Sequence, residues 1–121
     1  MAQQKSQTNA LSYCIDLIGG KWKPIILFNI SKGINRFNKL FNEIDDINRQ
    51  MLSKQLKELE KSGILERTLF PEIPPRVEYT LTPLGKSLMT VVQAMNKWGQ
   101  KQQEEVKVPK KKVTQQVTLF E

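Results

Sequence analysis

The segment from Asn48 to Gly63, NRQMLSKQLKELEKSG, determines how the rest of the chain can fold. It predicts a helix, because Asn48 can cap the first turn, Gly63 can end the last, and strong helix formers fill the interior. At about 100° per residue, one side carries a narrow apolar stripe and the opposite side is polar and basic. The stripe is Leu52, Leu56 and Leu59; the polar side is Gln50, Lys54, Lys57 and Lys61, with Ser53 at its flank.

Two interpretations of this helix are open on its own sequence. In the first, it is an ordinary amphipathic surface helix whose lysines are solvated and partly offset by Glu58 and Glu60. In the second, one face packs on a core and the other binds an anionic partner. The segments on either side favour the second interpretation.

Composition limits the classes of function. At 121 residues we expect one domain per chain, marginal enough that a second subunit would help, and the net charge of +7 favours nucleic acid, an anionic membrane or an acidic protein as partner. Cys14 is the only cysteine and there is no histidine, so we expect no disulfide, metal site, cofactor or hydrolytic chemistry. Without a signal peptide or membrane span in the sequence, we expect a cytoplasmic protein.

The residues before the central helix predict three further helices. Residues 1–9 are predicted to be a flexible arm, residues 10–18 a first helix ended by Gly19-Gly20, and the apolar run after Pro24 a central core helix. Phe37, Leu40, Phe41 and Ile44 form the stripe of a third helix. The short turn Asp45-Asp46 then joins it to the central helix, which is a helix-turn-helix pattern whose second helix lies in the major groove of DNA.

The residues after Gly63 predict a β-hairpin and a long helix. Residues 64–70 and 76–81 are rich in β-branched and aromatic residues, and a proline-rich tip separates them, so the hairpin would be the wing of a winged helix-turn-helix. On the second strand we expect Val77, Tyr79 and Leu81 to pack, and Arg76, Glu78 and Thr80 to face water. Thr82-Pro83 starts the long helix. Its apolar residues recur at alternating spacings of four and three and indicate a dimer seam: Leu84, Leu88, Val91, Met95 and Trp98.

An alternative for this long helix is that it folds back on its own domain.

Pro109 ends any helical pattern, and residues 104–121, with Lys110 to Lys112, are predicted to be a basic, flexible tail. The predicted domain is therefore residues 10–103. Its fold class is mainly α with a small β-hairpin (α+β).

An ordered set of short motifs resembles the HxlR-type winged-helix transcriptional regulators of bacteria and archaea. The motifs are Leu17 to Trp22, Gly33, Arg36-Phe37, Met51-Leu52, Leu56 to Glu60, Pro74 to Tyr79 and Leu81 to Gly85. The resemblance as a whole covers nearly all of residues 10–99. The resemblance implies a homodimer paired through its first and last helices, with Leu11 and Ile15 as candidates on the first helix, bound to a palindromic operator.

Two features depart from the family pattern. Members that sense electrophiles or oxidants typically carry a cysteine near the start of the first helix, where residues 8–10 have none, and Cys14 lies inside that helix. We expect Cys14 to be structural, with thiol sensing as the alternative. The turn before the central helix, which contains Pro-Gly in many relatives, is Asp45-Asp46 here, and two carboxylates would repel a phosphate backbone unless they face away from it.

We therefore predict a sequence-specific DNA-binding regulator, a repressor, that acts as a homodimer, with its effector unassigned. The candidates for base reading are Gln50, Ser53 and Lys54; those for backbone or wing contacts are Arg36, Arg49, Lys57, Lys61 and Arg76. Arg36 has the alternatives of pairing with Glu43 or packing on Phe37, and Arg76 those of pairing with Glu72 or Glu78. The competing function is a winged-helix protein-interaction module that binds an acidic partner.

Overall fold

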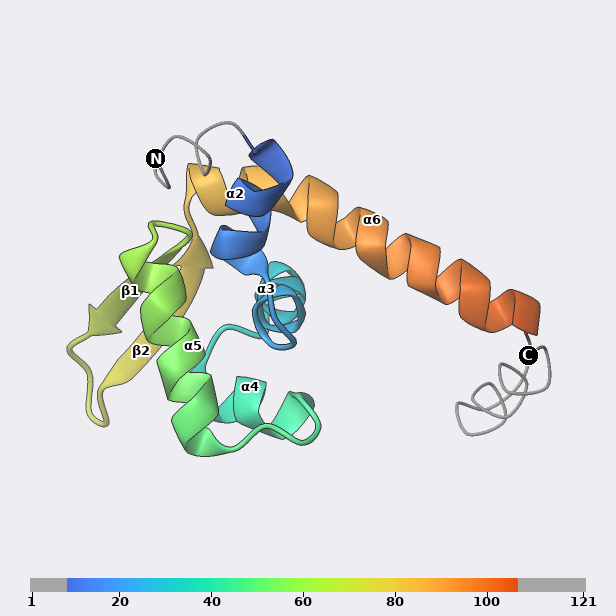
Figure 1. Cartoon of the computed structure of the whole chain (residues 1–121). Helices are drawn as coiled ribbons and strands as arrows, with labels where there is room; N and C mark the ends of the chain where they lie inside the picture. Colours follow the sequence, from blue (N-terminus) through green and yellow to red (C-terminus); the bar gives the residue numbers. More distant parts are fainter. Residues whose placement is uncertain (1–8, 107–121) are drawn as a thin grey trace. The chain divides into compact units, whose positions relative to one another are not determined.

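The computed structural model describes residues 9–106 of the chain, in two parts (Figure 1). The first part, residues 1–90, contains α2 (Ala10–Ile18), α3 (Lys23–Ser31), α4 (Phe37–Glu43), α5 (Arg49–Lys61), β1 (Leu65–Phe70), β2 (Arg76–Leu81) and the start of α6 (Pro83–Val106). The second part, residues 91–121, is described only where it continues α6. The predicted arm and tail lie outside the described residues, except for Asn9, which precedes α2, and residues 104–106. Those three residues continue α6, so the predicted start of the tail after residue 103 falls inside a helix that reaches Val106.

Polar side chains cap three helices: Asn48 and Thr82 as predicted, and Asn9, which was expected to belong to the arm. The side chain of Asn48 accepts a hydrogen bond from the Met51 amide at 2.7 Å and caps α5, and Asn9 caps α2 in the same way. Thr82 accepts from the Gly85 amide at 3.1 Å and donates to the Gly63 carbonyl at 2.5 Å. The hydroxyl of Thr82 therefore ties the first turn of α6 to the end of α5.

The first turn of α6 also approaches the start of the hairpin closely. Gly85 is buried, and a Cβ at this position would lie 2.3 Å from the carbonyl oxygen of Ile64. Because no side chain fits in that space, the helix can pack here only with glycine.

The core is built mainly from the apolar face of α5 and from α3. Leu52, Leu56 and Leu59 are at most 1% exposed, and Ile26 and Leu27 of α3 are completely buried. This confirms the predicted stripe of α5 and the central position of α3. α5 packs against β1 and α4, and α3 packs against α4 and β2.

The stripe predicted for α4 is only partly buried. Leu40 and Ile44 lie in the core, whereas Phe37 and Phe41 are half-exposed. The reason is that α4 is short and α5 begins just after it, so the rings form part of the surface beside Arg49, described below. A buried polar residue was not predicted either: the Asn29 side chain donates to the Ile25 carbonyl at 2.9 Å within α3.

β1 and β2 form an antiparallel hairpin in which Leu65 pairs with Leu81 and Phe70 with Arg76. The amide of Tyr79 donates to the Asn35 carbonyl at 2.9 Å, which attaches β2 to the loop before α4. The predicted contrast between a packed and a solvated face of β2 is wrong at Arg76 and Glu78. Both are half-buried because they pair with each other.

The turn between α4 and α5 contains an unusual backbone conformation. Asp46 has a φ of 69°, the left-handed region that non-glycine residues rarely adopt, although aspartate is among those that tolerate it. Both Asp45 and Asp46 are exposed. Asp46 thus adopts the positive φ that this turn requires, a conformation that the glycine of Pro-Gly would adopt with less strain.

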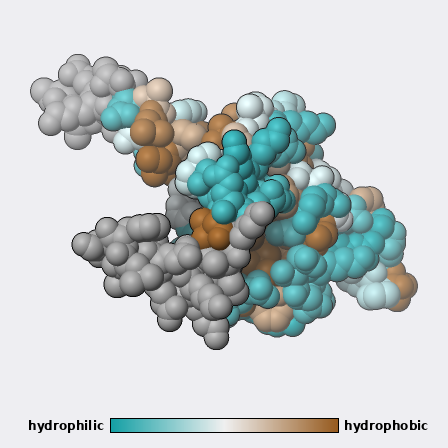
Figure 2. Space-filling view, turned by 90° about the vertical axis from the view of Figure 1, so that its right-hand side faces the viewer, coloured by the Kyte–Doolittle hydropathy of each residue, from teal (hydrophilic) through white to brown (hydrophobic). Residues whose placement is uncertain are grey.

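Hydrophilic residues cover most of the face seen in Figure 2, and hydrophobic residues form smaller patches. The large apolar side chains that are exposed come mainly from α2 and α6: Leu11, Tyr13, Ile15, Leu84, Val91, Met95 and Trp98. Within residues 9–106, no helix has the length and apolarity that a bilayer crossing requires.

Candidate nucleic-acid interface

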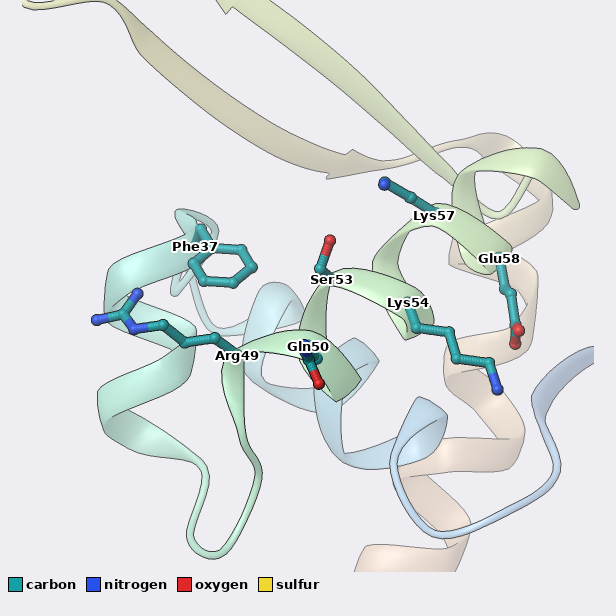
Figure 3. A pocket seen from close by; sticks show the side chains of 7 residues that line it. All are labelled: Phe37, Arg49, Gln50, Ser53, Lys54, Lys57 and Glu58. Carbon is teal, nitrogen blue, oxygen red and sulfur yellow. The ribbon is translucent and has the colours of Figure 1, made fainter.

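The polar face of α5 is an open surface of cations and hydrogen-bonding groups. Gln50, Lys54, Lys57 and Lys61 are exposed and Ser53 is half-buried. Gln50, Ser53, Lys54 and Lys57 line a groove of about 610 Å³ together with Phe37, Arg49 and Glu58 (Figure 3). Lys61, one turn beyond Lys57, lies outside it. None of the three exposed lysines forms an ion pair within the described part of the chain, so their charge is available to a partner.

Arg49 joins the start of α5 to α4. Its guanidinium donates to the Asn38 side chain at 3.2 Å and lies 4.4 Å from the centre of the Phe41 ring and 6.0 Å from that of Phe37. A cation over an aromatic face is held electrostatically without being neutralised. Arg49 therefore keeps its charge while its position is fixed. Asn38, a supporting residue here, was not singled out from the sequence, and Phe41 was expected only as part of the apolar stripe of α4.

Glu58 is the only carboxylate that lines this groove, and it already has a partner. It lies 2.7 Å from the ammonium of Lys23, at the start of α3, whose side chain is only 14% exposed. The hydrogen bond and charge of Lys23 hold the pKa of Glu58 below its ordinary value, with a smaller contribution from Lys54. Since Lys23 satisfies Glu58, that carboxylate offsets the α5 lysines less than the sequence suggests.

The two candidate arginines of the wing region are paired with carboxylates. Arg76 lies 2.9 Å from Glu72 and 3.2 Å from Glu78, and its guanidinium stacks 4.0 Å from the centre of the Phe70 ring. Arg36 lies 3.5 Å from Glu78, not against Glu43. The alternative in which Arg76 pairs with Glu72 and Glu78 is therefore what the structure contains.

The candidates for a subunit contact differ in exposure. Leu11 and Ile15 of α2 are more than half exposed, as are Met95 and Trp98 of α6, and Leu84 and Val91 are about 40% exposed. Leu88 is 8% exposed and belongs to the core of its own chain. The seam predicted for α6 thus contains one residue that is already buried and four that are not.

Cys14 is half-buried on α2 and forms no disulfide. Across residues 9–106, no three side chains of the His, Cys, Asp or Glu type come together as a metal site would require. The chemistry that the described surface offers is therefore hydrogen bonding and positive charge on a helix, beside a hairpin.

A helix-turn-helix followed directly by a two-stranded wing, with the cationic face of the second helix open, is the architecture of a winged-helix DNA-binding domain. The model of the family described as "HxlR-like helix-turn-helix" matches residues 17–107. The chain belongs to this HxlR-like family.

Relatives of this HxlR-like protein occur in bacteria and archaea. An uncharacterized HTH-type transcriptional regulator of Bacillus subtilis (strain 168), YdeP, is 40% identical over 92 residues, which are 76% of this chain and 72% of that one. One from Methanothermobacter thermautotrophicus is 41% identical over 90 residues, covering 74% and 69%.

Solved structures share the fold. The redox regulator HypR in its reduced form has a TM-score of 0.75 and 36% identity, with 82% of this chain and 98% of that one covered. The HTH-type transcriptional regulator ytcD has a TM-score of 0.72 and 34% identity, with 78% of this chain and 96% of that one covered. The HxlR-like chain is accordingly a winged-helix DNA-binding transcriptional regulator. Proteins of this class bind DNA and are not enzymes.

Proposed function

We propose that this regulator binds a palindromic operator as a homodimer, with α5 of each subunit in the major groove. The observation that carries the proposal is the row of unpaired cations and hydrogen-bonding side chains on the exposed face of α5. In helix-turn-helix docking the first half of the second helix contacts the bases. Gln50, Ser53 and Lys54 are therefore the base-reading residues, since glutamine pairs with adenine and lysine with guanine.

Other cations contact the phosphate backbone and set the register. Arg49 is fixed against Phe41 and Asn38 at the start of α5, and Lys57 and Lys61 follow further along it. Phosphate contacts of this kind supply affinity without sequence information. Arg36 stands beside them at the start of α4, although it shares its charge with Glu78.

The second subunit packs on the exposed apolar residues of α2 and α6. Exposed leucine, methionine and tryptophan side chains on two helices are costly in water, and a symmetric contact between two copies buries them. A dimer doubles the number of base contacts and gives the operator its two-fold symmetry.

We propose that binding represses transcription, because a dimer bound to a promoter blocks RNA polymerase without any further contact. We also propose that the protein acts in the cytoplasm. The alternative function, an interaction module for an acidic protein, rests on the same lysines.

Selection of duplexes from a randomised pool, followed by a salt titration, separates the two functions. The proposed function predicts a palindromic motif and an affinity that falls log-linearly with salt, with a slope near the number of phosphate contacts. No enriched motif together with salt-insensitive binding would contradict it.

A further inference from the structure

The tip of the wing, residues 71–75, exposes one large apolar side chain among prolines, and its one charged residue, Glu72, is paired with Arg76. Ile73 is completely exposed, and Pro71, Pro74 and Pro75 surround it, also exposed. Proline fixes φ and leaves few backbone conformations open, so the tip presents a stiff apolar surface. An isoleucine held in water at the end of a hairpin contributes nothing to the described core.

The charged residues of the tip and of β2 behind it contact one another. Arg76 contacts both Glu72 and Glu78, its ring contact with Phe70 covers one face of the guanidinium, and its Nε is buried without a hydrogen-bond partner. With Arg36, which also contacts Glu78, the cluster contains two arginines and two glutamates, whose formal charges cancel. For Arg76 to reach a phosphate or a minor groove, it would have to leave two carboxylates and an aromatic ring.

The tip also adjoins the surface that α5 presents. A second groove of about 570 Å³ lies between the wing tip and the start of α4, lined by residues 36–39 and 72–77. Phe37 lines both this groove and the groove of α5, so the two grooves lie on either side of one residue. Lys39, which forms no ion pair among the described residues, adds a free cation at its wall.

We propose that the wing meets DNA through Ile73, packed on the sugar edges of the minor groove beside the base pairs that α5 reads, and that Arg76 is a positioning residue that holds the tip. The proposal rests on the function proposed above. Apolar side chains are well suited to the minor groove walls and to deformable base steps, where they read shape more than base identity. The arginine serves through its planar fork, which a lysine with the same charge cannot reproduce.

The first experiment uses two duplexes, a selected operator with flanking base pairs and the same operator trimmed at both flanks. Ile73→Ser should weaken binding to the long duplex about fivefold, leave the trimmed duplex unaffected and keep the salt slope, because only an apolar contact is lost. Leu69→Ser is the matched control, since Leu69 is an exposed apolar residue of β1 that precedes the tip, and it should change the affinity for neither duplex.

An equal effect of Ile73→Ser on both duplexes, or none, would overturn the apolar contact. If the variant left DNA binding unaffected but changed the sedimentation mass, the tip would contact a second copy of the chain instead, which also overturns the proposal.

The second experiment asks whether Arg76 is a ligand or a support. If it is a support, Arg76→Lys should weaken binding to the long duplex as much as Arg76→Ala, and Glu78→Gln should weaken it too, because the arginine loses its anchor. If it is a phosphate ligand, Arg76→Lys should keep most of the affinity, and Glu78→Gln should free the guanidinium and tighten binding with a steeper salt slope.

Glu66→Gln is the matched control for Glu78→Gln, because Glu66 is an exposed glutamate of the same hairpin without an ion pair in the described chain. Tighter binding by Glu78→Gln than by Glu66→Gln would overturn the supporting role. A parent protein that bound no duplex at all would refute the proposed function and the wing contact together, whereas a parent that binds with these variants silent would refute the wing contact alone.

Discussion

α5 and α6 are both amphipathic, but α5 leaves only its polar side exposed, whereas α6 leaves part of its apolar side exposed. α5 buries its leucine stripe almost completely and exposes unpaired lysines, whereas α6 exposes Val91, Met95 and Trp98. The leucines of α5 need nothing beyond their own chain, so the open face of that helix calls for a polar, anionic partner. The exposed residues of α6 call for an apolar one. The two helices therefore indicate two different partners, DNA and a second copy of the chain.

The strongest test of this difference is to make the exposed face of α6 polar. Met95→Lys combined with Trp98→Lys should give monomers and lower operator affinity at least about a hundredfold, because one subunit loses the contacts of the other half-site. Sedimentation and operator binding measure the two effects. Leu88 is unsuitable for this test, since it is buried in its own chain and a lysine there would unfold the monomer.

The control adds the same charge elsewhere on the same helix. Gln93→Lys with Asn96→Lys changes two exposed polar positions of α6 and should leave the dimer intact. A dimer of unchanged mass in the Met95 and Trp98 variant would show that these residues do not form the subunit contact.

The next test divides the polar face of α5 into its two proposed roles. Gln50→Ala and Lys54→Ala should each cost about 1–3 kcal/mol and relax the preference at particular symmetric positions of the operator. Lys61→Ala should weaken all sequences alike and reduce the salt slope by about one per site. Selection from randomised duplexes and a salt titration distinguish them. If Lys61→Ala altered the motif and the other two did not, α5 would be docked in the opposite direction.

A smaller effect is expected from the one carboxylate in the α5 groove. The pKa of Glu58 is lowered by the hydrogen bond and charge of Lys23, so the pair stabilises the folded chain above the ordinary value of 4.5 and this contribution is lost as the pH falls through the lowered pKa. The stability difference between the parent and Glu58→Gln should therefore shrink below about pH 4.5 in urea titrations. Glu60→Gln, an exposed neighbour, is the control, and an equal pH dependence for both variants would count against the pair.

The smallest effect is expected at Cys14. Cys14→Ala should leave operator binding unchanged, with and without diamide, because we expect the thiol to be a structural residue of α2. Release of the parent from DNA by diamide, absent in the variant, would assign a sensing role to Cys14.

The order and type of the elements could be predicted from the sequence because each has local signals. Asn48 caps α5, Thr82 caps α6 and the proline-rich tip separates two strands, all within a few residues of the structure they specify. The exposed face of α5 followed from its periodicity for the same reason.

Contacts between distant residues could not be predicted in this way. The partner of Glu58 is 35 residues away in the chain, and the partner of Arg36 is 42 residues away. Periodicity marks Arg76 and Glu78 as solvent-facing, yet pairing makes them half-buried. The burial of Leu88 differs from that of the rest of the predicted seam for a similar reason, since a heptad-like spacing does not say which surface a residue meets.

The base-reading candidates on α5 make no side-chain hydrogen bond to the rest of the described chain. At the start of α6, in contrast, Thr82 is held by hydrogen bonds and Gly85 has no space for a side chain. Replacing Gln50, Ser53 or Lys54 should therefore cost little stability, whereas any replacement of Gly85 must displace the backbone at Ile64. Operator specificity can then drift rapidly between descendants of this protein without endangering the fold. The same separation makes α5 a segment into which the exposed residues of another regulator can be transplanted to redirect this scaffold to a new operator.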